Sequence, residues 1–387
     1  MRKLNDTIAR LGALRARTTA TTPSDAQDRL EDLGGFGSNP GDLRARSYVP
    51  DGLRAGAALV VVLHGCTQTA AGYDRGSGWS QLAAEAGFAV LFPEQQRANN
   101  PNLCFNWYNP EDARRGSGEA LSIRQMVAAM IAAHDLDPAR VYVTGLSAGG
   151  AMTSVMLATY PEVFAGGAII AGLPFGTAST VPEAFDRMRG HGGPDAAALG
   201  RLIRAASDHR GPWPTVSVWH GHSDATVSAA NANMIVEQWR GVHELGEQPS
   251  LSETVEGYPR HVWRDAAGRD AIEEYRITGM GHGTPLKTAG EDGCGIAGPY
   301  MLEARISSTR RIASFWGVLA ADESRVVAQA PAAQAASPAA PVTLREPARR
   351  TRKLEPVSRS ATPPPAAAPS GVQKIIEDAL RTAGLMR

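Results

Sequence analysis

The fold is decided by the stretch VYVTGLSAGG, residues 141–150. A β-branched, apolar run leads into the pattern Gly-x-Ser-x-Gly, and residues with helical spacing follow, so the expected order is strand, sharp turn and helix. Small residues at Gly145 and Gly149 let the backbone turn tightly and lift the hydroxyl of Ser147 above the end of a sheet. A glycine-rich loop without chemistry is the alternative. The strand before and the helix after favour a nucleophilic serine.

The surrounding chain alternates between strand and helix patterns. Residues 58–63, ALVVVL, form a continuous apolar run that is typical of a strand buried on both faces. Further strands are expected at 88–92, 141–144, 168–171, 215–219 and 273–277, and helices at 79–85, 117–134, 151–159, 228–240 and 302–316, with Pro93 ending the second strand. Repeated strand–helix units predict an α/β fold with a doubly wound, mostly parallel sheet. In such sheets the chemistry gathers at the carboxyl ends of the strands.

Composition divides the chain into four parts. Residues 1–40 are predicted to be a short amphipathic helix followed by a linker, and residues 41–320 a catalytic domain. Within that domain residues 172–214 form an insertion, interpreted either as a cap over the site or as a surface excursion. Residues 321–370 are rich in Ala and Pro and predict a disordered linker. Residues 371–387 carry an apolar helical stripe, which either docks to a partner or apolar surface or forms only marginally in water.

Charge and cysteine content exclude several classes of protein. Lys plus Arg and Asp plus Glu both number 39, so no global basic field favours a nucleic-acid partner. No apolar run is long enough to predict a transmembrane segment, and the first 17 residues are too charged for a standard secretory signal. Three cysteines are too few for a disulfide scaffold.

A serine hydroxyl is a poor nucleophile unless a base removes its proton, and that base is usually a histidine held by a carboxylate. His282 follows the last predicted strand in a glycine-rich loop, and Asp224 follows the strand at 215–219. The order Ser147, Asp224, His282 is the one that an α/β-hydrolase fold requires. Taken singly, Asp224 is interpretable as a turn or capping residue and His282 as a surface loop residue. Together they predict a catalytic triad.

The same fold needs backbone donors for an oxyanion. One is the N–H of Ala148, directly after the nucleophile, and the other is expected from the loop HGCTQ at residues 64–68, where we assign it to Cys66. The alternative is that Gly65 only makes room for the turn.

The run His220-x-His222-x-Asp224 resembles a metal-hydrolase pattern. Ala225 stands where a further histidine would follow, and the sequence has no second His/Cys cluster with ligand spacing. We therefore expect no metal and no cofactor.

Cys66 and Cys104 each lie in a loop after a core strand. A disulfide between them would brace the oxyanion loop in an oxidising compartment, and two reduced thiols are the alternative. The aromatic residues Trp107, Tyr108 and Trp219 are candidates for lining an acyl pocket, or are ordinary core.

These motifs together resemble the poly(3-hydroxybutyrate) (PHB) depolymerase family of esterases, which is related to feruloyl and acetylxylan esterases. The resemblance covers about residues 45–320 and is carried by HGCTQ (64–68), CFNW (104–107), GLSAGG (145–150), the segment 220–227 and GMGH (279–282). It implies an α/β-hydrolase that cleaves carboxylic esters without a cofactor, with Ser147 as nucleophile, Asp224 as acid, His282 as base and Cys66 in the oxyanion hole.

The resemblance leaves the substrate and the compartment open. Polyhydroxybutyrate or its 3-hydroxyacyl oligomers, feruloyl or acetyl esters and other short-acyl esters are all candidates, and a peptidase or acyltransferase using the same triad is the less favoured alternative. Many relatives are secreted, which favours an extracellular protein with a disulfide. With no visible signal peptide, a cytoplasmic location is the alternative.

Overall fold

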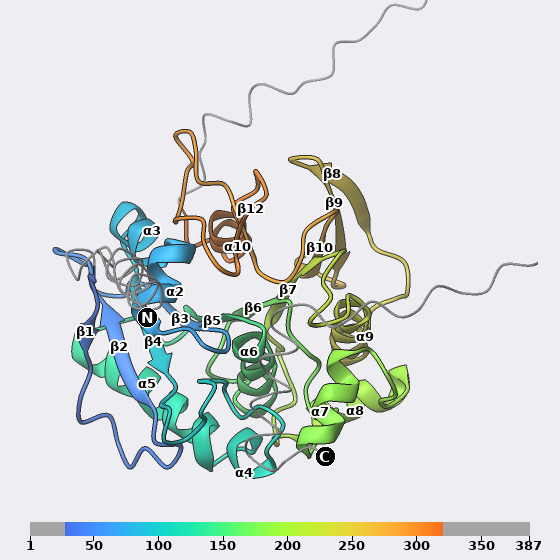
Figure 1. The fold of residues 1–387 in the computed structure, drawn as a ribbon, viewed down its shortest axis with the longest axis horizontal. Helices are drawn as coiled ribbons and strands as arrows, with labels where there is room; N and C mark the ends of the chain where they lie inside the picture. Colours follow the sequence, from blue (N-terminus) through green and yellow to red (C-terminus); the bar gives the residue numbers. More distant parts are fainter. Residues whose placement is uncertain (1–27, 320–387) are drawn as a thin grey trace, which may run out of the picture. The chain divides into compact units, whose positions relative to one another are not determined.

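The structure, a computed structural model, describes residues 28–319. These residues build a ten-stranded sheet in the order β1-β2-β4-β3-β5-β6-β7-β10-β9-β8 (Figure 1). The neighbours from β4 to β10 are all parallel, whereas β1, β2, β8 and β9 join the two edges in antiparallel pairs. The predicted mostly parallel sheet is therefore confirmed.

The central strands are β3 (Leu59–Leu63), β4 (Ala89–Glu94), β5 (Val141–Leu146), β6 (Gly166–Ile170), β7 (Thr215–Gly221) and β10 (Asp270–Ile277). The edge strands are β1 (Glu31–Asp32), β2 (Arg44–Tyr48), β8 (Leu251–Val255) and β9 (Tyr258–Arg264). A separate parallel pair is formed by β11 (Thr284–Leu286) and β12 (Met301–Glu303). The helices are α2 (Ala70–Ser77), α3 (Trp79–Ala86), α4 (Pro110–Ala113), α5 (Gly118–His134), α6 (Ala148–Thr159), α7 (Val181–Met188), α8 (Ala196–Ala205), α9 (Ala230–His243) and α10 (Ser308–Phe315).

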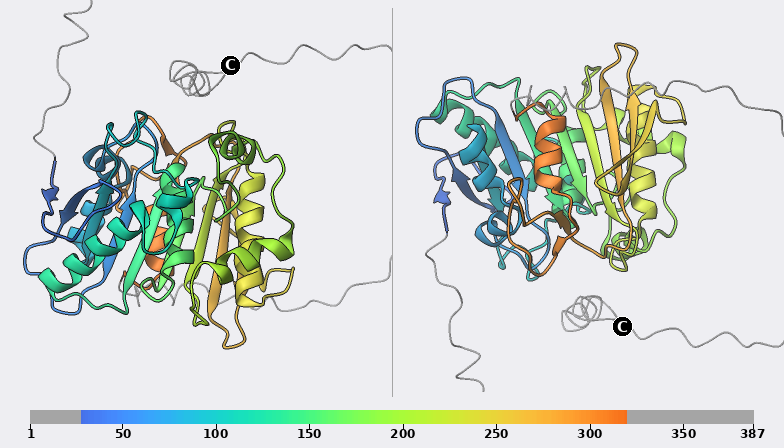
Figure 2. Two further views of the ribbon diagram at one scale, coloured as in Figure 1. Left: turned by 90° about the horizontal axis from the view of Figure 1, so that it is seen from below. Right: turned by 90° about the horizontal axis from the view of Figure 1, so that it is seen from above.

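Each face of the sheet has its own hydrophobic core. The side chains of β3 enter both cores, which explains why its sequence does not alternate between apolar and polar residues. Leu59, Val61 and Leu63 belong to the core under α5, α6, α8 and α9. Val60 and Val62 belong to the opposite core, under α2, α3 and α10. Figure 2 shows these two helix layers from opposite sides. Because both faces are covered, every position of the strand is apolar.

Several predicted boundaries differ from the structure by a few residues, and two of the differences have a clear physical reason. The strand predicted to stop at Pro93 continues to Glu94 as β4. Its pairing with β3 ends at Val61↔Leu91, so the absent N–H of Pro93 breaks no register pair on that side. The helix expected at 302–316 is shorter and begins later, as α10. Residues Met301–Glu303 form β12 instead, and Ser307 caps the start of the helix by accepting a hydrogen bond from the N–H of Arg310.

Other elements have weak sequence patterns. The strands β2, β8 and β9 at the sheet edges were not predicted, and Glu31–Asp32, within the expected linker, forms β1. The insertion at 172–214 contains α7 and α8. It packs beside α9, where the side chain of Gln238 donates to the carbonyl oxygens of Phe175 and Leu199.

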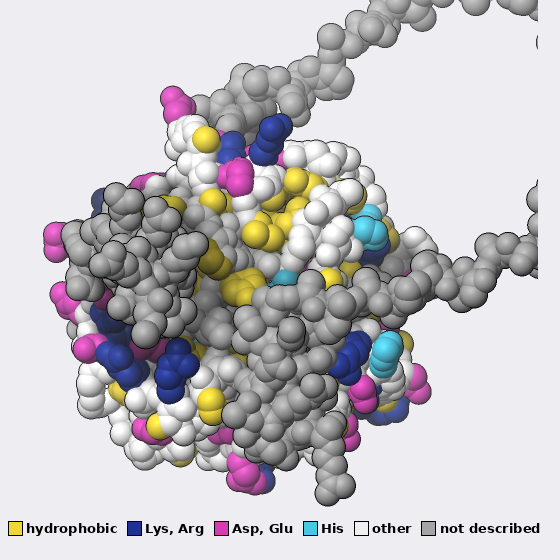
Figure 3. Space-filling view, viewed as in Figure 1, with side chains coloured by type: hydrophobic (Ala, Val, Ile, Leu, Met, Phe, Trp, Pro, Cys, Tyr) yellow, Lys and Arg dark blue, Asp and Glu magenta, His cyan; other side chains and the backbone are white. Residues whose placement is uncertain are grey.

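The predicted N-terminal helix, the Ala/Pro-rich linker and the helix at 371–387 lie outside the described residues. Within residues 28–319 no helix has the length and apolarity that a membrane crossing requires. On the face shown in Figure 3, hydrophobic side chains gather between the regions of α10 and β9, and charged side chains lie mostly around them.

Candidate active site

Ser147 lies in the turn between β5 and α6, as predicted. Its backbone has φ +57° and ψ −116°, a strained conformation for a residue with a side chain. The N–H of Ser147 donates to the carbonyl of Ile170 on the neighbouring strand at 2.9 Å, which holds the turn in place.

The two glycines of the motif are required by close backbone contacts. A Cβ atom on Gly145 would lie 2.3 Å from the carbonyl oxygen of Gly149. A Cβ atom on Gly149 would lie 2.3 Å from the carbonyl oxygen of Leu63 and 2.5 Å from that of His64. These contacts press the start of α6 against the end of β3, so the loop at 64–68 lies beside the serine turn.

Asp224 and His282 are brought together from the ends of β7 and β10, which are parallel neighbours. The Nδ1 atom of His282 lies 2.6 Å from Oδ2 of Asp224. The two loops are also joined through the backbone, where the N–H of Ser223 donates to the carbonyl of Met280 at 2.9 Å. A proton on Nδ1 shared with Asp224 leaves Nε2 of His282 as the basic nitrogen.

The side chain of Asp224 is fully buried, and its hydrogen bonds favour the ionised form. Its Oδ1 atom accepts from the N–H groups of Thr226 and Val227 at 2.8 and 2.9 Å. Burial opposes ionisation, but the hydrogen bonds from His220 and His282 outweigh it and hold the pKa of Asp224 well below its usual range. Asp224 therefore carries a negative charge 2.6 Å from the ring of His282.

His220 contacts the acid rather than forming part of a metal cluster. Its Nε2 atom lies 2.9 Å from the carbonyl oxygen of Val227 and 3.4 Å from Oδ2 of Asp224. Among the described residues there is no group of three or more His, Cys, Asp or Glu side chains arranged to hold a metal ion. The sequence pattern drew attention to His220, but only the structure shows that it supports Asp224.

The loop at 64–68 offers a backbone donor beside the serine turn. His64 is buried, and its Nε2 atom accepts from the N–H of Gln95 at 3.1 Å, so Nδ1 donates to the carbonyl of Gly65 at 2.8 Å. Burial lowers the pKa of His64, which keeps the ring neutral in this structural role. Among the hydrogen bonds of the described residues, none uses the N–H of Cys66 or of Ala148. Both donors are available for a ligand.

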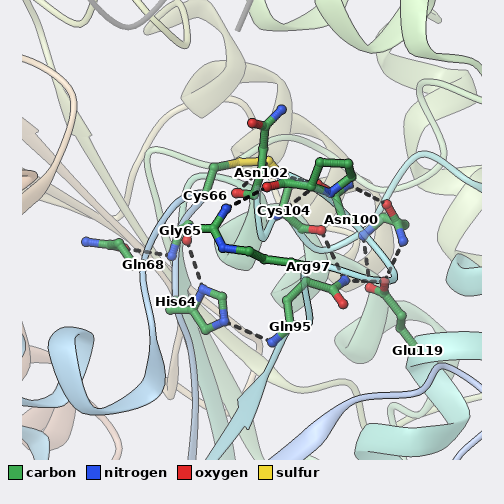
Figure 4. The surroundings of a disulfide bond; sticks show 12 residues. His64, Gly65, Cys66, Gln68, Gln95, Arg97, Asn100, Asn102, Cys104 and Glu119 are labelled. Carbon is green, nitrogen blue, oxygen red and sulfur yellow. Dashed lines mark hydrogen bonds between the residues drawn. A yellow bond between two sulfur atoms is a disulfide. The ribbon is translucent and has the colours of Figure 1, made fainter. Parts of the chain in front are cut away.

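A disulfide joins Cys66 to Cys104, and a polar network lies beneath it (Figure 4). The centre of the network is Glu119, which is fully buried in the first turn of α5. Burial, followed by the charge of Asp112, raises the pKa of Glu119 to about 8, against the hydrogen bonds from Asn106 and Gln95. Nothing in the sequence distinguished Glu119 from a surface residue at the start of a helix.

The three predicted substrate residues differ in position. Trp219 is 0% exposed, stacks on Tyr275 with ring centroids 3.8 Å apart and donates to Ser217. It is therefore a core residue, which corrects the prediction. Trp107 is buried to 8% exposure and meets the half-buried Tyr108 edge-on at 5.7 Å. These two remain candidates.

Tyr300 was missed by the sequence analysis. Its ring meets that of His282 edge-on, with centroids 6.1 Å apart. It lies in the loop between β11 and β12, whose sequence carries no recognisable motif. Tyr300 thus packs directly against the predicted base.

Comparisons with known proteins agree on one chemistry. A family model described as "Esterase PHB depolymerase" matches residues 44–247. The chain is 50% identical over 292 residues to poly(3-hydroxyalkanoate) depolymerase C of Paucimonas lemoignei, covering 75% of this chain and 70% of that protein. It is 33% identical over 265 residues to feruloyl esterase B of Neurospora crassa, covering 66% of this chain and 88% of that protein.

Among solved structures, the acetyl xylan esterase from Aspergillus awamori matches with a TM-score of 0.61 and 28% identity, covering 65% of this chain and 93% of that one. Each of these names describes an enzyme that hydrolyses carboxylic esters.

Proposed function

The chain belongs to the PHB depolymerase family of esterases and is a carboxylic ester hydrolase with the α/β-hydrolase fold, and from that premise we propose that it cleaves polyhydroxybutyrate or its 3-hydroxyacyl oligomers through a triad of Ser147, His282 and Asp224. The observation that carries the triad is the 2.6 Å contact between His282 Nδ1 and Asp224 Oδ2, at the same sheet edge as the strained serine turn. The 50% identity to a poly(3-hydroxyalkanoate) depolymerase supports the substrate class.

In the proposed reaction, Oγ of Ser147 attacks the ester carbonyl carbon while Nε2 of His282 takes the hydroxyl proton. The negative charge on the carbonyl oxygen is stabilised by the N–H groups of Cys66 and Ala148. His282 then gives its proton to the leaving alcohol, and the C–O bond of the ester breaks to leave an acyl group on Ser147. A water molecule, deprotonated by His282, hydrolyses this acyl-enzyme and releases the acid.

The Cys66–Cys104 disulfide is consistent with this protein acting in an oxidising compartment. That supports the extracellular alternative, in which a polymer too large to enter a cell is degraded outside it.

A substrate panel on purified protein tests the proposal. We expect the highest kcat/KM on 3-hydroxybutyrate oligomers, with lower values on methyl ferulate and acetylated xylan. The Ser147→Ala variant should lose about 10⁴-fold or more of the turnover of p-nitrophenyl butyrate, whereas Ser179→Ala, at an exposed serine, should retain it.

Mass spectrometry of the protein with a slow ester should find the acyl group on Ser147. Unchanged turnover in Ser147→Ala would refute the triad. A higher kcat/KM on feruloyl or acetyl esters would refute the substrate class and leave the triad standing.

A further inference from the structure

We propose that Glu119 is a positioning residue for the oxyanion hole. Its side chain anchors the loop at 95–106, and this loop in turn holds the N–H of Cys66 in place. This inference rests on the proposed function and adds to it a residue that no motif of the sequence identifies.

Glu119 holds the loop at 95–106 at both of its ends. Its Oε1 atom accepts from the side-chain amides of Gln95 at 2.6 Å and Asn106 at 2.8 Å. Its Oε2 atom accepts from the backbone N–H of Asn106 at 2.9 Å. The amide of Asn99, between the two ends, approaches Oε1 at 3.4 Å. A single buried side chain therefore fixes the start, the middle and the end of the loop.

The same loop is attached to the oxyanion loop at three places. The N–H of Gln95 donates to His64 at 3.1 Å, and the N–H of Thr67 donates to the carbonyl of Asn102 at 2.7 Å. Between these two links lies the disulfide from Cys66 to Cys104 (Figure 4). Cys66 is thus held on both sides and at its own side chain by a loop that Glu119 anchors.

Gln95 makes the connection continuous. Its side-chain amide donates to Glu119 and also to the carbonyl of Cys104 at 3.1 Å. Its backbone N–H contacts His64. A displacement of Gln95 would therefore reach Cys66 by two routes, through the disulfide and through the residue at the end of β3. An oxyanion donor acts only when it is placed against the developing charge, so small displacements reduce kcat.

The cost of burying Glu119 argues that its position matters. Its hydrogen-bond partners are neutral amide groups, and no positive charge compensates it among them. Ionisation of a carboxyl in such a place is unfavourable, and even the protonated group is costly to bury unless it is hydrogen-bonded. The geometry uses its two oxygens as acceptors that a shorter or apolar side chain would not supply.

The first test is the Glu119→Ala variant, assayed with p-nitrophenyl butyrate. Its kcat is calculated per active serine, and the active serines are counted by mass spectrometry as the fraction of protein that carries an acyl group on Ser147. We expect kcat to fall at least about tenfold while KM stays within about twofold, because the lost interaction acts in the transition state. The Glu119→Gln variant keeps an oxygen that accepts from the side-chain amides of Gln95 and Asn106 but loses the acceptor for the backbone N–H of Asn106. We expect it to recover most of the kcat that Glu119→Ala loses and to stay within about threefold of the parent protein. Glu111→Gln, at an exposed glutamate nearby, is the matched control and should not change kcat.

A second variant guards against loss of folding in Glu119→Ala. Gln95→Met removes the side-chain links to Glu119 and Cys104 but keeps the backbone N–H that contacts His64, and we expect the same selective fall in kcat. If Glu119 acts through the disulfide loop, the combination of Glu119→Ala with Cys104→Ser should lose less than the product of the two single losses.

A fall in melting temperature with kcat per active serine unchanged would overturn the inference and assign Glu119 a purely structural role. A rise in KM alone, or fully multiplicative losses in the double variant, would also overturn it. Failure of the proposed function would be seen separately, as turnover that survives in Ser147→Ala.

Discussion

Two buried carboxyl groups serve the loops on either side of Ser147, and their surroundings shift their pKa values in opposite directions. Asp224, beyond β7, contacts the rings of His282 and His220, and its pKa is held well below the usual range despite burial. Glu119, beneath the loop after β4, contacts neutral amides, and burial raises its pKa to about 8. Burial is common to both, so the partners decide the direction.

The difference matches two kinds of task. In the proposed reaction Asp224 must be charged, because its partner His282 becomes positively charged. Glu119 needs no charge for its proposed task, because the group that it places, a backbone N–H, never changes charge. A site can therefore use one buried carboxyl as a charge and another as a fixed acceptor.

The largest expected effect comes from replacing each carboxyl with an amide of the same shape, which tests the two tasks separately. Asp224→Asn should lower kcat about 10⁴-fold, because an amide in this place favours the wrong tautomer of His282. Glu119→Gln should stay within about threefold of the parent protein, since an acceptor oxygen remains. Steady-state kinetics on p-nitrophenyl butyrate compares the two, and similar losses in both variants would remove the distinction.

The next effect concerns the covalent link on the oxyanion side. Cys104→Ser opens a cross-link between residues 38 positions apart, which should lower the free energy of unfolding by about 3–4 kcal/mol on the chain-entropy model. We expect kcat to fall about tenfold as well, because Cys66 loses one of its attachments. Urea unfolding with and without dithiothreitol provides the control: the reductant should weaken the parent protein and leave Cys104→Ser unchanged.

A smaller effect follows from the opposite pKa shifts. Asp224 has a folded-state pKa below its unfolded value, so its contribution to stability is complete above about pH 5 and is lost as the pH falls through the acid range. Glu119 has a folded-state pKa of about 8, above its unfolded value near 4.5, so it costs stability as the pH rises between these values.

Urea unfolding between pH 3 and pH 9 checks both signs. Asp224→Asn should lower the free energy of unfolding relative to the parent protein, and this loss should be smallest at the acid end of the range. Glu119→Gln should raise the free energy of unfolding relative to the parent protein toward the alkaline end. Across the pH range each difference should change by on the order of 1–3 kcal/mol. Curves that run parallel for all three proteins would contradict the assignment.

The smallest kinetic effect is expected at Trp219. Trp219→Phe should lower the free energy of unfolding by about 1–3 kcal/mol, because a core ring and its hydrogen bond to Ser217 are lost, and it should leave KM unchanged. Trp107→Phe, at one of the two residues that remain substrate-binding candidates, provides the comparison. A selective rise of KM in Trp219→Phe would restore its place among the substrate residues.

The sequence was most informative where the local pattern and the tertiary role agree. The apolar runs of β3 and β5, the turn at Ser147 and the positions of Asp224 and His282 after successive strands all follow from rules that act within a few residues. Strand β8 is mainly exposed and polar, so it lacks the apolar pattern that identifies the central strands.

Other features depend on contacts between distant parts of the chain. Trp219 belongs to the core because Tyr275, on a neighbouring strand, stacks against it. Glu119 is buried because the loop at 95–106 folds over it. Neither contact leaves a trace in the residues adjacent to Trp219 or Glu119, so the sequence alone did not predict them.

The complete burial of α6 has an electrostatic consequence for Ser147. All residues of this helix, Ala148–Thr159, are buried, and the helix begins directly after the serine. The aligned peptide dipoles place a partial positive charge of roughly half a unit at that end, in surroundings where salt and water screen it weakly. The backbone itself thus supplies a permanent electric field that favours an anion above Ser147, and this field has no group that a change of pH can neutralise.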